Sequence, residues 1–377
     1  MTIAKAATTG VDEIAIDVVS YTHSPGANTD HITANGCPMR TIITRLLPWL
    51  ITAGIFAIIF TRIPVSSVIE ALSNVRFAPY LALMLPYSLF YCLVDTFVLT
   101  RLIHWFHQPV PYRRLLPIRA SSYILSLLVS GLGQGGLAFY VHRREGIPFL
   151  ALVGTMVFLG VMEFIQLALY AAIGIMAFYP HLMAAFAPLY IVLIAVIGLG
   201  LCLIHRGAGT LSKFLFILPG AAKMRLGQWL EQRDASLFHT FRQVRVWHAA
   251  LTLLYKAPNF LMAVLVQHVA LQLFGVEVPL ARLFTMLPIV FLAASVPGTV
   301  AHLGTSQAAW LYVFADYGTD AQILAYSLVA HVTFMVLNSL IGLAFMPFAL
   351  KGLRDVAGSA RRTNAPGPTT APDSPTE

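Results

Sequence analysis

Long apolar segments constrain this chain more than any other feature of its sequence. A helix needs about 20 predominantly apolar residues to cross the hydrocarbon core of a bilayer. Charged residues make up only 11% of the chain, whereas soluble proteins carry about a quarter. The sequence therefore predicts an all-α, polytopic membrane protein with about six full transmembrane helices. The six segments are 42–61, 78–100, 148–178, 188–205, 246–274 and 320–350.

Two further apolar stretches are interrupted by helix-breaking residues. Stretch 120–142 has four glycines near its middle, and stretch 283–315 contains Pro297, Gly298 and Gly304. The flanks of each break are too short to cross a bilayer alone. Irregular backbone at membrane depth is tolerated where protein shields it or where it lines a water-filled cavity. The breaks therefore indicate either two re-entrant hairpins at a central site or glycine-rich kinks where helices pack closely.

The distribution of basic residues favours the hairpins. Arginines lie on both sides of stretch 120–142, the loop 206–245 is also basic, and the loop 179–187 contains no Lys or Arg. Because cytoplasmic loops are enriched in Lys and Arg, a hairpin that enters and leaves on the cytoplasmic side keeps both basic regions inside. Applied to the rest of the chain, the same rule predicts that the second hairpin enters the membrane from the opposite face. Both termini are then cytoplasmic, in a bacterial cytoplasmic (inner) membrane.

Each predicted hairpin is followed by a long helix, and the two units have opposite orientations. That arrangement is the inverted repeat found in many transporters. Polar segments flank the apolar region: residues 1–39 and 356–377 are predicted to be disordered, and residues 40–355 to form the transmembrane domain. The first segment lacks the basic start and apolar core of a signal peptide. The sequence leaves open whether translation begins at Met1 or at Met39.

Three motifs together resemble a known family. They are SGLGQGGLAFYVHRREG in the first interrupted stretch, GVMEFIQL in the next helix and SVPGTVAHLGTSQAAW in the second interrupted stretch. Their order, over about residues 40–350, is similar to the membrane domain of lysylphosphatidylglycerol synthases and its stand-alone, flippase-like relatives, including hopanoid-associated members. The separate soluble domain that carries the family's synthase activity has no counterpart here. The resemblance therefore implies movement of a lipid, or of a lipid-linked molecule, between leaflets.

The resemblance also implies candidate substrate-binding residues in the first hairpin. Family members commonly carry a Gly-Glu pair followed by an arginine. In this chain Gln134, Gly135 and Gly136 occupy that region, and Arg143 and Arg144 come later. Guanidinium groups suit phosphate recognition, although the same arginines also follow from cytoplasmic enrichment alone.

The second motif and the second hairpin extend this set. Glu163 matches an acid that the family often follows with arginine, whereas Phe164 follows it here. In the second hairpin Gly304 fits the family pattern, and Gln307 stands where an acid is often found. Glutamine in place of glutamate keeps hydrogen bonding but removes the charge that would select a cationic headgroup.

Ionisable groups at bilayer depth are costly and so are functional candidates by default. Glu163 is expected to bond a headgroup or the backbone amides at Gly133–Gly136, or else to be a protonated structural acid. His302 and His331 are candidate headgroup contacts, although a lone intramembrane histidine is often a packing residue.

Two more ionisable residues have structural interpretations. Asp95 is expected to pair with Arg101 or Arg119. For Lys256 two interpretations stay open: a role in transport, or an ammonium group that extends to the phosphate level and has no such role. Segment 64–77 has apolar residues at helical spacing and is predicted to lie on the membrane surface.

The predicted function is a membrane flippase or transporter whose partners are lipids with an anionic or lipid-linked headgroup. One alternative is a non-catalytic scaffold for a lipid- or glycan-synthesising enzyme. Another is an intramembrane transferase that uses Glu163 with His302 or His331. The sequence has no nucleotide-binding motif, and His104 and His107 lack the acidic or thiol partner of a metal site. No cofactor, metal or nucleic-acid partner is therefore expected, and no enzymatic activity.

Overall fold

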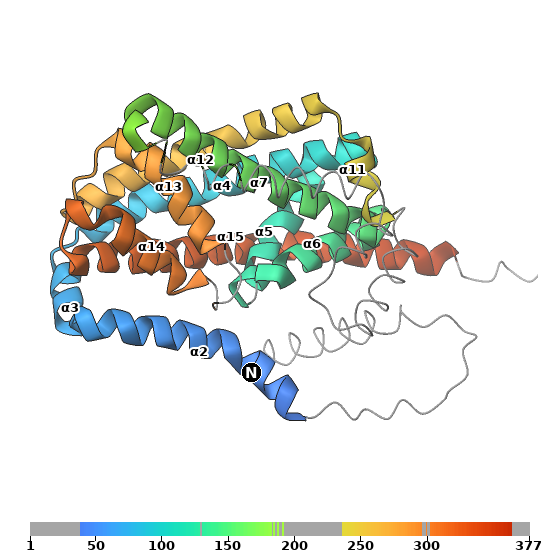
Figure 1. Ribbon diagram of the computed structural model, residues 1–377. Coiled ribbons are helices and arrows are strands. Elements are labelled where there is room, and N and C mark those ends of the chain that lie inside the picture. The colour runs from blue at the N-terminus through green and yellow to red at the C-terminus, as the bar shows by residue number, and fades with distance from the viewer. Residues whose placement is uncertain are drawn as a thin grey trace, which may run out of the picture. The chain divides into compact units, whose positions relative to one another are not determined.

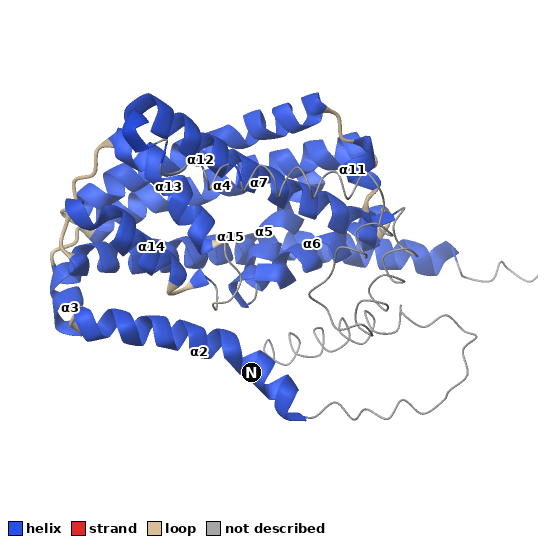
Figure 2. Cartoon of the chain, viewed as in Figure 1, coloured by secondary structure: helices blue, strands red, loops and turns tan. Residues whose placement is uncertain are grey.

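The computed structural model describes residues 38–128, 130–182, 184, 187, 191, 236–295, 299 and 302–363. The chain divides into two compact units, Met1–Leu46 and Leu47–Glu377. The described part of the first unit is the start of one helix; the account below concerns the second unit. Throughout its described residues the second unit is built from helices and loops (Figures 1 and 2). The longer helices are α2 (Pro38–Arg62), α3 (Val65–Ser73), α4 (Phe77–Phe106), α5 (Tyr112–Leu128), α6 (Ser130–Glu145), α7 (Phe149–Phe178), α11 (His239–Gln243), α12 (Val246–Leu273), α13 (Leu280–Ala294), α14 (Thr305–Phe314) and α15 (Asp320–Thr363).

Four described helices, α4, α7, α12 and α15, are long and apolar enough to cross a membrane. They confirm the predicted spans 78–100, 148–178, 246–274 and 320–350. A fifth span is obtained if Trp49–Arg62 and Val65–Ser73 count as one, although an 81° bend separates them. That bend turns α3 away from the direction of α2; the segment is helical as predicted, and its position on the membrane surface stays a prediction. The predicted span 188–205 lies outside the described residues, apart from residue 191.

The C-terminal end of the transmembrane domain differs from the predicted one. Helix α15 continues to Thr363 and so runs into the segment 356–377 that was predicted as a disordered tail. Ala and Arg, which recur in that stretch, are good helix formers. Residues 1–37 and 364–377 lie outside the described part of the chain.

The long helices bury a polar face and expose an apolar one. Ser88, Asp95 and Thr96 of α4 are buried, whereas apolar side chains four residues apart on the same helix are exposed. Apolar stripes of this kind also occur on α12 and α15, as expected where lipid is the solvent. The exposed stripes are Leu81, Leu85, Leu89 and Leu93 on α4, Leu254, Leu261, Leu265 and Val269 on α12, and Val332, Val336, Leu340 and Leu343 on α15.

Helices α5 and α6 form the first predicted hairpin. Their sequences are separated only at residue 129, and neither helix is long enough to span a bilayer. Arg114, near the start of α5, lies 3.8 Å from the carboxylate of Glu145 at the end of α6. Gln108, just before α5, donates to the Glu145 carbonyl at 2.6 Å. The chain therefore enters and leaves this hairpin at the same end of the bundle.

Helices α13 and α14 form the second hairpin. A Cβ placed on Gly318, after α14, would lie 3.1 Å from Val276, before α13. Phe274 contacts Tyr80 at the start of α4, with ring centroids 5.5 Å apart. The first hairpin opens instead beside the end of α4. The two hairpins thus open at opposite ends of the bundle, as the inverted repeat requires.

The two repeats also interlock. Helix α5 packs on α15, and α13 packs on α7, so the first helix of each hairpin contacts the long helix of the other repeat. A glycine permits each contact. A Cβ on Gly342 would lie 2.5 Å from the Ala120 carbonyl oxygen, and one on Gly174 would lie 2.5 Å from Thr285 Oγ1. Both glycines are needed for close approach of the helices.

Candidate functional site

Four charged side chains from four helices meet inside the bundle. Asp95 of α4 accepts from Arg119 Nε of α5 at 2.5 Å. Its other carboxylate oxygen lies 3.2 Å from the Lys256 ammonium group on α12. Lys256 also forms an ion pair with Glu163 of α7. Two positive and two negative charges therefore balance in what we call the ionic cluster, defined as Asp95, Arg119, Glu163 and Lys256.

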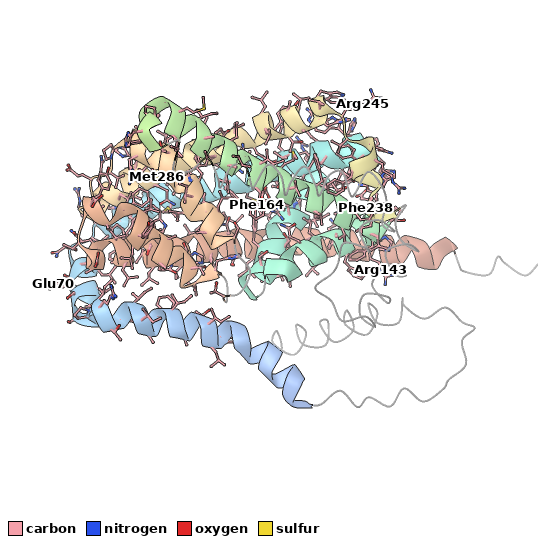
Figure 3. All side chains as sticks on the ribbon, viewed as in Figure 1. Glu70, Arg143, Phe164, Phe238, Arg245 and Met286 are labelled. Carbon is pink, nitrogen blue, oxygen red and sulfur yellow. The ribbon has the colours of Figure 1, made fainter. Side chains whose placement is uncertain are left out.

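Three of the four side chains in the cluster are shielded from solvent. The exposed fraction of the side chain is 1% for Asp95, 8% for Arg119 and 6% for Lys256, but 43% for Glu163. Buried charges persist only when they are paired and hydrogen-bonded, because desolvation costs several kcal/mol per ion. Glu163 is therefore the member of the cluster that a ligand can reach. Phe164, the next residue on α7, shows the position of this helix segment in Figure 3.

Aromatic and amide groups surround the cluster. Tyr123 of α5 lies with its hydroxyl 3.4 Å from Asp95 Oδ2, and the Arg119 guanidinium lies 5.1 Å from the centre of the Tyr123 ring. Arg119 also donates to Gln134 Oε1 of α6 at 3.5 Å. This last bond connects α6, the glycine-rich helix of the first hairpin, to the cluster.

The structure thus brings together two residues that were predicted to bind substrate, Glu163 and Gln134. The connection runs from Glu163 through Lys256, Asp95 and Arg119 to Gln134. The predicted bond from Glu163 to the amides at Gly133–Gly136 was wrong. Helix α6 already begins at Ser130, so those amides belong to a helix, and the Glu163 carboxylate is bonded to Lys256 instead. Gly135 and Gly136 follow Gln134 on the same helix.

The predicted arginines lie apart from the cluster. Arg143 is nine residues beyond Gln134 on α6, about 14 Å along the helix. Its guanidinium lies 5.3 Å from the centre of the Phe139 ring, and Arg144 Nε lies 3.6 Å from Glu145. Figure 3 shows Arg143 and Arg245 at the same end of the bundle, far from Glu70.

In the second hairpin, the candidate residues Gly304 and Gln307 form the N-terminal cap of α14. Gly304 has a positive φ of 92°, and the Gln307 side chain accepts a 2.7 Å hydrogen bond from the Gly304 amide. Gln307 is completely buried. His302, with φ of 61°, precedes this turn. Gln307, the third residue of α14, thus caps the start of the helix, and its side-chain oxygen is already engaged.

His331 lies half-buried in α15. The transferase alternative requires Glu163 to act with His302 or His331, yet the Glu163 carboxylate is engaged with Lys256 of α12. Among the described residues, no group of three or more His, Cys, Asp or Glu side chains has the geometry of a metal site.

Sequence reasoning underestimated the cluster because it interpreted its members singly. Asp95 was predicted to pair with Arg101 or Arg119, and it pairs with Arg119. The interpretation in which Lys256 extends to the phosphate level was wrong, because the side chain is buried between two carboxylates. A usable signal was present: Asp95, Glu163 and Lys256 lie in three different apolar spans, and a charge at bilayer depth needs an opposite charge as its partner.

Polar groups continue inward from the cluster. Asn259 lies one helical turn beyond Lys256 and is 6% exposed, and Ser88 lies two turns from Asp95 and is fully buried. Among the described residues, neither the Asn259 amide nor the Ser88 hydroxyl has a hydrogen-bond partner. Buried polar groups are normally satisfied. The interior next to the cluster is therefore suited to a polar guest.

Comparison with known proteins agrees with this architecture. A search of curated proteins gave no match. The family described as "Lysylphosphatidylglycerol synthase TM region" matches residues 45–342, which includes all four helices of the cluster and both hairpins. The chain is a multi-pass membrane protein that belongs to the lysylphosphatidylglycerol synthase TM-region family.

Proposed function

We propose that this protein moves a lipid, or a lipid-linked molecule, between the two leaflets of the membrane. One observation carries the proposal: the buried Lys256 ammonium group is held by one inaccessible carboxylate, Asp95, and by one accessible carboxylate, Glu163. A phosphate group binds ammonium and guanidinium groups in the same way as a carboxylate does. An anionic headgroup can therefore replace Glu163 at Lys256 without leaving a buried charge unpaired.

This exchange makes the cluster a two-state element. While Glu163 is bound, the four charges cancel and the cluster joins α7 to α12. When a headgroup takes its place, Glu163 is free to turn outward through its exposed side, and the link between the helices is weakened. A ligand shifts such an equilibrium only by its difference in affinity for the two states, and the pairing with Lys256 provides that difference.

The opposed hairpins supply a route to the cluster. Irregular or short helices at membrane depth line cavities in many transporters, and alternating access uses one repeat moving against the other. Gln134 of α6 bonds Arg119 of α5, so movement of α6 relative to α5 changes the surroundings of the cluster directly. The acyl chains of the lipid would remain in the bilayer while the headgroup passes inside.

We propose a bacterial cytoplasmic membrane as the location, with both termini cytoplasmic. The end of the bundle where α4 ends carries Arg101, Arg113, Arg114, Arg143 and Arg144, together with Arg242 and Arg245. Cytoplasmic surfaces are enriched in such residues. We propose no catalytic step, because a transport cycle of this kind requires only exchange of ion pairs.

The test is a scrambling assay with purified protein in liposomes. A fluorescent phospholipid that a membrane-impermeant reductant bleaches only in the outer leaflet reports its movement between leaflets. Wild-type protein should bleach nearly all of the label, and Glu163→Gln and Lys256→Met should lower the initial rate at least tenfold. Glu70→Gln, on the exposed α3, removes one carboxylate away from the cluster and should leave the rate within twofold of wild type.

The comparison between variants also separates the alternatives. Size-exclusion profiles and helical content must match wild type before a loss of rate is interpreted. Absence of scrambling by folded wild-type protein, with phosphatidylglycerol, phosphatidylethanolamine and a polyprenyl phosphate each tried, would contradict an autonomous flippase and favour a scaffold. Equal rates for wild type and the cluster variants would contradict the assignment of the site.

A further inference from the structure

A polar cleft lies where α4 ends and α12 begins, outside the ionic cluster. It has a volume of about 520 Å³, and its lining includes Trp105, Arg242, Arg245 and Trp247. Arg242 and Arg245 are exposed at its surface, and none of the described residues that line it is acidic. Figure 3 shows Arg245 at this end of the bundle. The cleft thus combines two guanidinium groups with two indole rings.

An apolar groove lies farther along the same two helices. Its volume is about 370 Å³. Leu254 in its wall is 62% exposed, in contrast to the buried Lys256 two residues later. The groove therefore lies on the outer, lipid-facing surface of the helix pair. It is lined by Phe90, Leu93, Val94 and Phe97 of α4 and by Leu254, Tyr255 and Pro258 of α12.

Aromatic contacts make the cleft and the groove one continuous strip. The Tyr255 ring contacts Phe97 in the groove, with centroids 5.2 Å apart, and Trp105 in the cleft, with centroids 6.1 Å apart. Arg101 lies one helical turn from each of these α4 residues, and its guanidinium is 5.1 Å from the centre of the Phe97 ring. Leu254 is seven residues beyond Trp247, about 10 Å along α12.

Each part of this strip suits one part of a phospholipid. Guanidinium groups bind phosphate oxygens in a two-pronged geometry, and the start of α12 adds the positive end of a helix dipole. Tryptophan side chains favour the interface between headgroups and hydrocarbon. The apolar groove begins within about two helical turns of the cleft, in the direction an acyl chain would follow.

We propose that this strip binds an anionic phospholipid, with its phosphate between Arg242 and Arg245 and one acyl chain along the groove between α4 and α12. The site is separate from the ionic cluster, because Lys256 and Asp95 face the interior while Leu254 and Phe97 line the outer surface. It does not depend on the proposed transport function. Its occupant would hold α4 and α12 together on the face opposite the Lys256–Asp95 contact.

Lipid binding to delipidated, full-length protein in detergent tests the proposal, with native mass spectrometry as the readout. The probes are dioleoylphosphatidylglycerol, dioleoylphosphatidylcholine and inorganic phosphate. Wild-type protein should bind the anionic lipid at least fivefold more tightly than the zwitterionic one. The double variant Arg242→Gln/Arg245→Gln should weaken binding of the anionic lipid at least fivefold. Arg113→Gln/Arg114→Gln, which removes two positive charges from the same end but outside the cleft, should change it by less than twofold.

A groove variant distinguishes a lipid from a free anion. Leu254→Gln should weaken binding of phosphatidylglycerol severalfold. Inorganic phosphate at the same concentration should not compete. Effective competition by inorganic phosphate, or equal weakening by the two double variants, would overturn the proposal. So would unchanged lipid binding in both the arginine and the groove variants.

Discussion

The Lys256 ammonium nitrogen lies 3.2 Å from Asp95 Oδ1, although 161 residues separate the two in the chain. The second oxygen of the same carboxylate accepts from Arg119 at 2.5 Å. Asp95 is thus shared by two buried cations from different helices. This single carboxylate therefore joins α4, α5 and α12, and the consequences are measurable.

Replacing Asp95 with asparagine should be strongly destabilising. The substitution leaves Arg119 and Lys256 buried with one carboxylate between them. Breaking a buried ion pair by removing one partner costs about 3–5 kcal/mol. Thermal unfolding of the detergent-solubilised variant should therefore begin well below the wild-type temperature. The double variant Asp95→Leu/Arg119→Leu removes one charge of each sign and keeps Lys256 paired with Glu163, so it should be more stable than Asp95→Asn. The reverse order would contradict a charge-balanced cluster.

Replacing Glu163 with glutamine should have a much smaller effect on stability. Its side chain is 43% exposed, and Lys256 keeps its contact with Asp95. Partly solvated ion pairs contribute about 1 kcal/mol or less. The melting temperature of Glu163→Gln should thus stay close to wild type under conditions where its scrambling rate is lost. A collapse in stability equal to that of Asp95→Asn would show that Glu163 is a structural residue only.

Replacing Gly174 with alanine should destabilise the contact between the repeats. The added Cβ would lie 2.5 Å from Thr285 Oγ1 and 2.8 Å from the Thr285 Cα, which is backbone and cannot move alone. Overpacking of this kind costs about 1–3 kcal/mol. Gly160→Ala on the same helix is the matched control, because its added Cβ meets nothing within 4 Å. It should be neutral or slightly stabilising. Equal melting temperatures for the two variants would contradict the close packing of α7 on α13.

Acid should destabilise the protein through His107, which follows the end of α4. Its ring nitrogen Nε2 lies 2.7 Å from Thr155 Oγ1. Burial, together with the nearby His239, lowers the pKa of His107 from 6.5 to about 4. Between these values the unfolded chain binds a proton that the folded protein does not bind. The contribution of neutral His107 is therefore complete above pH 6.5 and is lost as the pH falls towards 4.

A variant isolates this contribution from those of other titrating groups. Melting temperatures measured at pH 7.5 and pH 5 should differ more for wild type than for His107→Gln. Glutamine can still bond Thr155 but does not titrate. Parallel pH dependence in the two proteins would show that His107 is not the group responsible.

Much of the architecture follows from local sequence. The spans 78–100, 148–178, 246–274 and 320–350 are visible because apolar length is a local property and lipid demands it. The two hairpins are visible because glycine and proline interrupt apolar stretches that basic residues flank. The positions of Arg114 and Glu145 at one end of the first hairpin, and of Val276 and Gly318 at one end of the second, bear out this inference.

The ionic cluster was decided by the tertiary structure. Asp95, Arg119, Glu163 and Lys256 lie in four helices, and their spacing in the chain contains no information about which side of each helix faces the others. Interpreted singly, Lys256 could be explained by extension of its side chain to the lipid surface. Packing of α12 against α4 points the Lys256 side chain inward instead, where the carboxylates of Asp95 and Glu163 replace water as partners of its ammonium group. The sequence alone determined that this is a multi-pass helical membrane protein with two broken segments. Only the assembled bundle decided which charges cancel, because a buried charge is tolerated only where another helix supplies its partner.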